Sequence, residues 1–136
     1  MKVHEIMNRS VITCHPDEAL STILNKLKLF KISGMPVAEK KRPVGMITYR
    51  DIYSFLPPPE EICKESSEVL EVKFATPIRE IMTKEIITCF PSTPVDTAAA
   101  LMVENDINRI PVVDRGRIVG IVTRWDIIKA LAEIEG

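Results

Sequence analysis

Two short segments of this sequence pair a threonine with an aspartate three residues later. Residues 48–51 read Thr-Tyr-Arg-Asp and residues 123–126 read Thr-Arg-Trp-Asp, each directly after an apolar run. At the start of a helix, such a pair can form a capping box, in which both side chains satisfy backbone N–H groups. The same geometry also suits a nucleotide, because a helix N-terminus attracts phosphate and a carboxylate accepts hydrogen bonds from ribose hydroxyls. Taken one at a time, the segments leave both interpretations open.

The two segments belong to a longer internal repeat. Residues 3–56 align with residues 78–131 without a gap, at a constant offset of 75 positions, and about a third of the aligned residues are identical. Such regularity indicates one structural unit built twice. Two similar units can pack across a pseudo-twofold axis and bury faces that neither buries alone, so we expect two related clefts.

Hydrophobic spacing predicts the order strand, helix, strand, strand, helix in each copy, which makes the fold class α+β with two β-α-β-β-α repeats. The first strands are expected at residues 11–13 and 86–88. We expect Asp17 to cap the first helix, and Thr93 to cap its counterpart with Pro94 at the first helical position. The expected core stripes of these helices are Leu20, Ile23, Leu24 and Leu27, and Val95, Ala98, Ala99 and Met102.

The remaining elements follow the same repeat. Paired strands are expected at residues 35–38 and 44–47, and again at 110–113 and 118–122. The closing helices should begin near Thr48 and Thr123, and three prolines at 57–59 should stop the first of them.

This pattern divides the chain into a first repeat at 1–57, a connector at 58–77 and a second repeat at 78–136. The connector is acidic, but it also carries apolar residues, namely Val69, Leu70, Val72 and Phe74. We therefore expect it to lie against the surface of the protein or at an oligomer contact.

Composition narrows the class of protein. At 136 residues with 46% hydrophobic content, the chain can bury a substantial core, and no apolar run is long enough to span a membrane. The N-terminus lacks the apolar stretch of a signal peptide, which favours a cytoplasmic location. A net charge of −1 argues against a dedicated nucleic-acid binder, although the locally basic first repeat keeps that alternative open.

Neither metal binding nor catalysis is indicated by the residues. The three cysteines, at 14, 63 and 89, lack the paired spacing of zinc sites, and we expect small buried thiols in a reducing compartment. The two histidines are His4 and His15, and no nucleophile stands at a telling distance from a base. We predict a protein that is not an enzyme and requires no cofactor.

Three patterns occur in both copies: (Ile/Val)-x-Thr-x-x-Pro, an apolar-Pro-Val strand, and Gly followed by two apolar residues and Thr-x-x-Asp-Ile. Together they resemble a tandem pair of CBS domains (cystathionine β-synthase domains), also called a Bateman module. The resemblance covers about 110 of the 136 residues. It implies a compact disc with two clefts for adenosine-containing ligands, such as AMP, ADP, ATP or S-adenosylmethionine and its derivatives.

The resemblance implies roles for particular residues in one cleft. Thr123 and Asp126 would contact ribose or phosphate. Arg109 and Arg124 would contact phosphate. The adenine would rest near three residues of the first repeat, namely Thr13, Glu18 and Ile23.

The other cleft would use Thr48 and Asp51, and its adenine would lie near Thr88, Thr93 and Ala98. The two clefts are not expected to be equal. Gly34 aligns with Arg109, so the Thr48–Asp51 cleft lacks that phosphate cation. We predict that the Thr123–Asp126 cleft is the tighter one for a phosphorylated ligand.

The resemblance predicts a regulatory module whose output passes through a partner protein or a change of oligomer. No enzyme, channel or DNA-binding domain is expected in these residues, so the regulated protein would be a separate, unidentified one. A homodimer through the closing helices is expected, with exposed apolar positions at Ile52, Phe55, Ile128 and Leu131. The alternative is a ligand-free interaction module whose clefts are filled by Met35, Met46 or Trp125.

Overall fold

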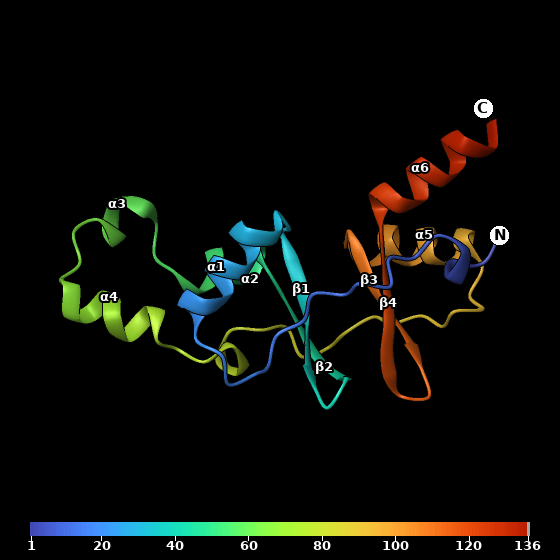
Figure 1. Cartoon of the computed structure of the whole chain (residues 1–136). Coiled ribbons are helices and arrows are strands. Elements are labelled where there is room, and N and C mark those ends of the chain that lie inside the picture. Colours follow the sequence, from blue (N-terminus) through green and yellow to red (C-terminus); the bar gives the residue numbers. More distant parts are fainter. Residues whose placement is uncertain (136) are drawn as a thin grey trace. The chain divides into compact units, whose positions relative to one another are not determined.

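The computed structural model describes residues 1–135, which form two compact units (Figure 1). One unit contains residues 12–40 and 44–86, and we call it the β1–β2 unit. The other contains residues 1–11, 41–43 and the chain from 87 onward, and we call it the β3–β4 unit. Each unit holds one antiparallel hairpin and its own hydrophobic cluster, so the α+β class with a repeated unit is confirmed.

In the β1–β2 unit, helix α1 packs beside a two-stranded sheet. Its elements are α1 (Leu20–Phe30), β1 (Gly34–Glu39), β2 (Arg42–Thr48), α2 (Tyr49–Phe55), α3 (Pro59–Ile62), α4 (Ser67–Phe74) and the 3₁₀ turn η2 (Ile78–Glu80). The core of the unit centres on Leu20, Ile23 and Leu27 of α1 and on Ile47 of β2, all at most 1% exposed. The helical spacing of these residues is the reason that α1 forms at this place.

The β3–β4 unit repeats this plan. Its elements are the 3₁₀ turn η1 (Val3–Glu5), α5 (Val95–Asn105), β3 (Arg109–Asp114), β4 (Arg117–Thr123) and α6 (Arg124–Glu135). The buried stripe of α5 is Val95, Ala98 and Met102, as the spacing predicts. In Figure 1 the β3–β4 hairpin ends in a tight turn, where Gly116 adopts a φ of 78° that suits glycine.

The short segment that opens each repeat packs in the unit of the other repeat. Residues 78–86 belong to the β1–β2 unit, and residues 1–11 belong to the β3–β4 unit. Thr83 pairs with Met46 of β2 through two backbone hydrogen bonds of 2.9 Å, and Asn8 pairs in the same way with Ile121 of β4. The compact units therefore differ from the sequence repeats by an exchange of their opening segments and by the placement of residues 41–43.

Glycine permits this close pairing in both units. A Cβ atom on Gly45 of β2 would lie 2.7 Å from Met82 Sδ and 2.8 Å from the carbonyl oxygen of Thr83. A Cβ on Gly120 of β4 would lie 2.5 Å from Met7 Sδ. Each opening segment thus lies directly on a strand at the one position that lacks a side chain.

The predicted helix caps are wrong at both repeats. Helix α1 begins after Ala19, and Asp17 instead pairs with Arg79. In the second copy Pro94 is itself the N-cap of α5, and the hydroxyl of Thr93 accepts a hydrogen bond from the N–H of Phe90. Thr93 thus satisfies an N–H group of the turn before the helix, whereas the Asp17 carboxylate pairs with a guanidinium from another segment.

The predicted first strands shrink to single bridges. Cys14 bridges Val37 and Cys89 bridges Val112, each in parallel orientation, and residues 11–13 and 86–88 form no strand. The following proline limits the run, because it has no N–H to extend a ladder. The later strands at 35–38, 44–47, 110–113 and 118–122 are confirmed inside β1 to β4.

Three expectations about burial need correction. Ile52 is 2% exposed and belongs to the core, whereas Ile128 and Leu131 are about half exposed. Trp125 is 66% exposed and Cys63 is also exposed, so neither fills a cavity or the core. Burial of Cys14 and Cys89 is confirmed.

The connector forms two short helices and docks through its end. Helix α4 contacts α1, Phe74 packs on the core of the β1–β2 unit, and the ammonium of Lys73 lies 5.9 Å from the ring centre of Phe55. Val72 remains 72% exposed. Across the described part of the chain, every helix is too short or too polar to cross a membrane.

Candidate functional site

The Thr-x-x-Asp segment of the first repeat lies where strand β2 passes into helix α2. Thr48 is the N-cap of α2, and Asp51 occupies the third helical position. The N–H and the hydroxyl of Thr48 both donate to Asp51 Oδ2, at 2.9 and 3.2 Å. This capping box fixes the carboxylate at the helix N-terminus, and both residues stay partly accessible.

The second copy has the same local geometry at the junction of β4 and α6. The N–H and hydroxyl of Thr123 donate to Asp126 Oδ2 at 2.8 and 2.9 Å, and the N–H of Asp126 donates to the threonine hydroxyl at 3.2 Å. Because these contacts span only three residues, the sequence spacing alone produces them. Both Thr-x-x-Asp pairs are therefore preformed.

The two carboxylates differ in what surrounds their second oxygen. The hydroxyl of Thr83 donates to Asp51 Oδ1 at 2.6 Å. The repeat offset of 75 aligns Thr83 with Asn8. The side-chain oxygen of Asn8 accepts from the N–H of Ser10 at 2.9 Å, and within residues 1–133, whose side chains the structure describes, Asp126 Oδ1 accepts no hydrogen bond.

Sequence reasoning missed Thr83 and Asn8. Each lies in the opening segment of one repeat and pairs through its backbone with the strand that precedes the Thr-x-x-Asp pair of the other, and the Thr83 side chain also contacts Asp51. Only one signal in the sequence pointed to them. Gly45 and Gly120, which precede the motifs, indicate a close backbone approach from some other segment.

Arg109 lies beside Thr123, and its contact with phosphate stays a prediction. The two residues are direct cross-strand partners in the β3–β4 ladder, and the N–H of Arg124 donates to the carbonyl of Asn108 at 2.9 Å. Burial lowers the pKa of the Arg109 guanidinium from its ordinary value. Arg124 is exposed on the first turn of α6.

The other predicted site residues are divided between the two units. Thr13, Glu18 and Ile23 lie in the β1–β2 unit with Thr48 and Asp51. Residues Thr88, Thr93 and Ala98 lie in the β3–β4 unit with Thr123 and Asp126. Each predicted cleft thus combines residues of both units, and the structure brings together the Thr-x-x-Asp half of each.

These adenine-side residues have distinct surroundings. Ile23 and Ala98 are both 0% exposed and belong to the hydrophobic cores. Thr13 is partly buried, and its carbonyl accepts from Lys26 Nζ at 3.2 Å. Thr88 is exposed on the surface and Thr93 is partly buried.

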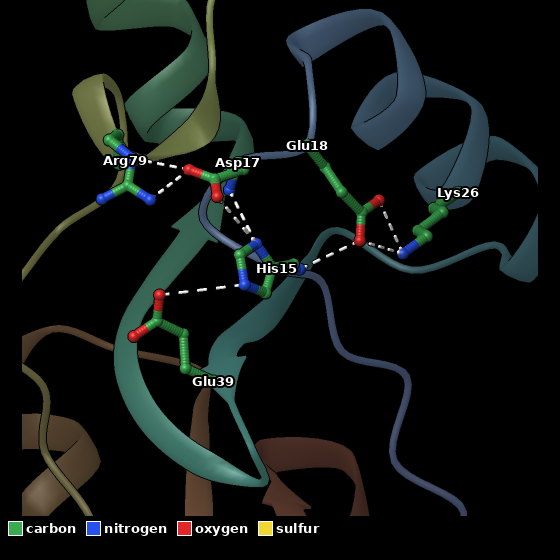
Figure 2. A network of polar contacts seen from close by, with 6 residues as sticks. All are labelled: His15, Asp17, Glu18, Lys26, Glu39 and Arg79. Atoms are coloured by element: carbon green, nitrogen blue, oxygen red, sulfur yellow. Dashed lines mark hydrogen bonds and ion pairs between the residues drawn. The ribbon is translucent and has the colours of Figure 1, made fainter.

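Glu18 is part of a polar network that Figure 2 shows around the turn before α1. Its carboxylate accepts from Lys26 Nζ at 2.9 and 2.8 Å and from the N–H of His15 at 2.9 Å. Burial alone would raise the pKa of Glu18, but the hydrogen bonds from Lys26 and His15 outweigh it and hold the pKa below its usual value.

The same network ties the turn to the opening segment of the second repeat. Arg79 donates through Nε at 2.9 Å, and through Nη2, to Asp17 Oδ1 (Figure 2). This contact lowers the pKa of Asp17. The N–H of Asp17 donates to His15 Nδ1 at 3.0 Å, and His15 Nε2 lies 3.8 Å from Glu39. The ion pair between Asp17 and Arg79 links the turn to the opening segment within the β1–β2 unit.

The family of the chain follows from comparison with known proteins. The family model described as CBS domain matches residues 3–58 and 78–133, which together span most of the chain. The chain belongs to the CBS-domain family. The matched ranges are the two repeats, and each contains one of the Thr-x-x-Asp pairs.

Relatives of this CBS pair include both small and large proteins. Uncharacterized protein MJ1426 of Methanocaldococcus jannaschii is 33% identical, over 96% of this chain and 91% of that protein. Inosine-5'-monophosphate dehydrogenase of the same organism is 30% identical over 94% of this chain, which spans only 23% of the dehydrogenase. The similarity to the enzyme is thus confined to a small part of its length.

Solved structures share the fold. The CBS domain pair of protein MJ0100, determined in complex with 5'-methylthioadenosine and S-adenosyl-L-methionine, is 29% identical. The match covers 98% of each chain with a TM-score of 0.77.

Proposed function

We propose that this CBS pair is a regulatory module that binds adenosine-containing ligands through its two Thr-x-x-Asp pairs. The observation that carries the proposal is the preformed box at Asp126, where threonine holds Oδ2 and Oδ1 accepts no hydrogen bond from the described residues. A carboxylate with a spare oxygen at a helix N-terminus can accept ribose hydroxyls. The adjacent N–H groups favour phosphate.

The comparison with MJ0100 supports the class of ligand. That CBS pair was solved with two adenosyl compounds, and it aligns with this chain over nearly its whole length. We extend adenosine recognition to this chain, with AMP, ADP, ATP and S-adenosylmethionine as candidates. In the proposal Arg109, beside Thr123, strengthens binding of a phosphorylated ligand, and Gly34 leaves the first-repeat site without that contact.

The output is proposed to pass through assembly or a partner protein, and not through catalysis. Helix α6 presents Trp125, Ile128 and Leu131, which are 66%, 49% and 53% exposed and lie three residues apart. This spacing gives one apolar helix face, which suits a homodimer contact or a regulated partner. A ligand that binds two assembly states unequally would shift the balance between them.

Titration calorimetry with AMP and S-adenosylmethionine tests the proposal, together with native mass spectrometry for bound ligand and oligomeric state. We expect Asp126→Asn to weaken AMP binding by roughly 10- to 100-fold, because a hydrogen bond to a charged group contributes about 1.5–3 kcal/mol. Asp114→Asn is the matched control, since Asp114 is an exposed carboxylate in the same unit. Equal AMP affinity of Asp126→Asn and wild type would refute the assignment.

A further inference from the structure

The two Thr-x-x-Asp pairs have the same local geometry. The residues at one aligned position, Thr83 and Asn8, make different contacts in the two copies. Thr83 donates to Asp51 Oδ1 at 2.6 Å, whereas the aligned Asn8 directs its side-chain oxygen to the N–H of Ser10. The backbones of Thr83 and Asn8 are held in the same way, by paired 2.9 Å hydrogen bonds to β2 or β4. The difference therefore lies in the side chain at one position.

The hydroxyl of Thr83 is held firmly. Both backbone groups of Thr83 pair with Met46, and the preceding Met82 lies against the bare Cα of Gly45. Threonine is also β-branched, which restricts rotation about χ1. The backbone that carries this hydroxyl is thus fixed on β2, and a ligand that needs the same position on Asp51 competes with the hydroxyl for it.

Counting acceptor positions shows the consequence for a ligand. A carboxylate offers about four lone-pair positions, two on each oxygen. At Asp51, the backbone and hydroxyl of Thr48 use both positions of Oδ2, and Thr83 uses one of Oδ1. At Asp126, Thr123 uses the two positions of Oδ2, and the described side chains occupy neither position of Oδ1.

We propose that Thr83 sets the sugar selectivity of the Asp51 site by occupying a position that a second ribose hydroxyl would need. The Asp126 site accepts both hydroxyls of a ribose, so it discriminates against a sugar that lacks one of them. The Asp51 site accepts one hydroxyl without displacing Thr83, so it binds ribose and 2′-deoxyribose ligands with similar affinity. This inference rests on the proposed function, because it assumes that the carboxylates bind the sugar.

The test compares AMP with 2′-deoxy-AMP at each site separately. Asp126→Asn leaves the Asp51 site for measurement, and Asp51→Asn leaves the Asp126 site. Calorimetry should give a ratio of the two dissociation constants near one in Asp126→Asn. Adding Thr83→Val, which removes the hydroxyl and keeps the shape, should raise that ratio about tenfold in favour of AMP.

The second copy provides the reciprocal experiment. In Asp51→Asn the ratio should already be about tenfold, and adding Asn8→Thr should lower it towards one. Thr83→Ser is the matched control, because it keeps the hydroxyl and should preserve the ratio near one in Asp126→Asn. If Thr83→Val fails to fold, Asn8→Thr still tests the role of the hydroxyl, because that variant keeps Thr83.

The outcomes separate this inference from the proposed function. If AMP binds and neither Thr83→Val nor Asn8→Thr changes the ratio, the role of Thr83 is refuted and adenosine binding stands. If neither nucleotide binds the wild-type protein, the proposed function fails for these ligands and the selectivity inference fails with it.

Discussion

Alanine at Gly45 should destabilise the protein more than alanine at Gly120. A Cβ at Gly45 meets the Thr83 carbonyl oxygen at 2.8 Å, and this backbone atom cannot move without breaking the pairing with Met46. A Cβ at Gly120 meets chiefly the flexible side chain of Met7, and the Asn8 carbonyl oxygen is 3.2 Å away. The first clash therefore displaces a backbone segment, while the second displaces a side chain.

The magnitudes follow from the two kinds of clash. Overpacking typically costs about 1–3 kcal/mol, and Gly→Ala recovers about 0.4–1 kcal/mol by restricting the unfolded chain. We expect a net loss of about 2 kcal/mol for Gly45→Ala and at most about 1 kcal/mol for Gly120→Ala. With a urea m-value of about 2 kcal/mol/M, these losses lower the unfolding midpoint by about 1 M and at most about 0.5 M.

Urea unfolding followed by circular dichroism measures the global effect, and amide hydrogen exchange measures the local one. The N–H of Thr83 donates to the carbonyl of Met46, so Gly45→Ala should speed its exchange. In Gly120→Ala the Thr83 amide is the internal control and should keep its wild-type protection. Equal midpoints for the two variants, or an unchanged Thr83 amide in Gly45→Ala, would refute the reasoning.

Two further predictions concern titratable groups. Because the folded-state pKa of Glu18 is lowered, its ionisation stabilises the fold above the unfolded pKa, and this contribution is lost as the pH falls through the folded value. Lys26→Met should raise the folded pKa of Glu18 and move that loss to higher pH, and a carboxyl NMR titration that shows no upward shift would contradict this. Burial raises the pKa of Cys14 to about 12 and that of Cys89 to about 11, while Cys63 is exposed. A thiol reagent such as DTNB should therefore label Cys63 in the native protein and all three thiols only in urea, and rapid native labelling of Cys14 or Cys89 would argue against their burial.

The parts of the fold that sequence reasoning predicted well are those with local causes. The stripe of Leu20, Ile23 and Leu27 follows from the helical period, and the box at Thr48 and Asp51 follows from a spacing of three residues. The helix caps were mispredicted for a related reason. Asp17 forms an ion pair with Arg79, which is 62 residues away along the chain. The residue spacing around a helix start cannot reveal such a distant partner.

The internal repeat is visible in the amino-acid sequence, and so is a Thr-x-x-Asp pair at the start of each closing helix. The sequence also determined that Gly34 and Arg109 differ between the copies. The tertiary structure alone decided that the opening segments are exchanged, and thus that Thr83 reaches Asp51 while Asn8 leaves Asp126 Oδ1 without a hydrogen bond from the described residues. The physical reason is distance along the chain. A capping box closes within one helical turn, whereas the contact from Thr83 spans 32 residues and exists only because Gly45 admits another segment onto its strand.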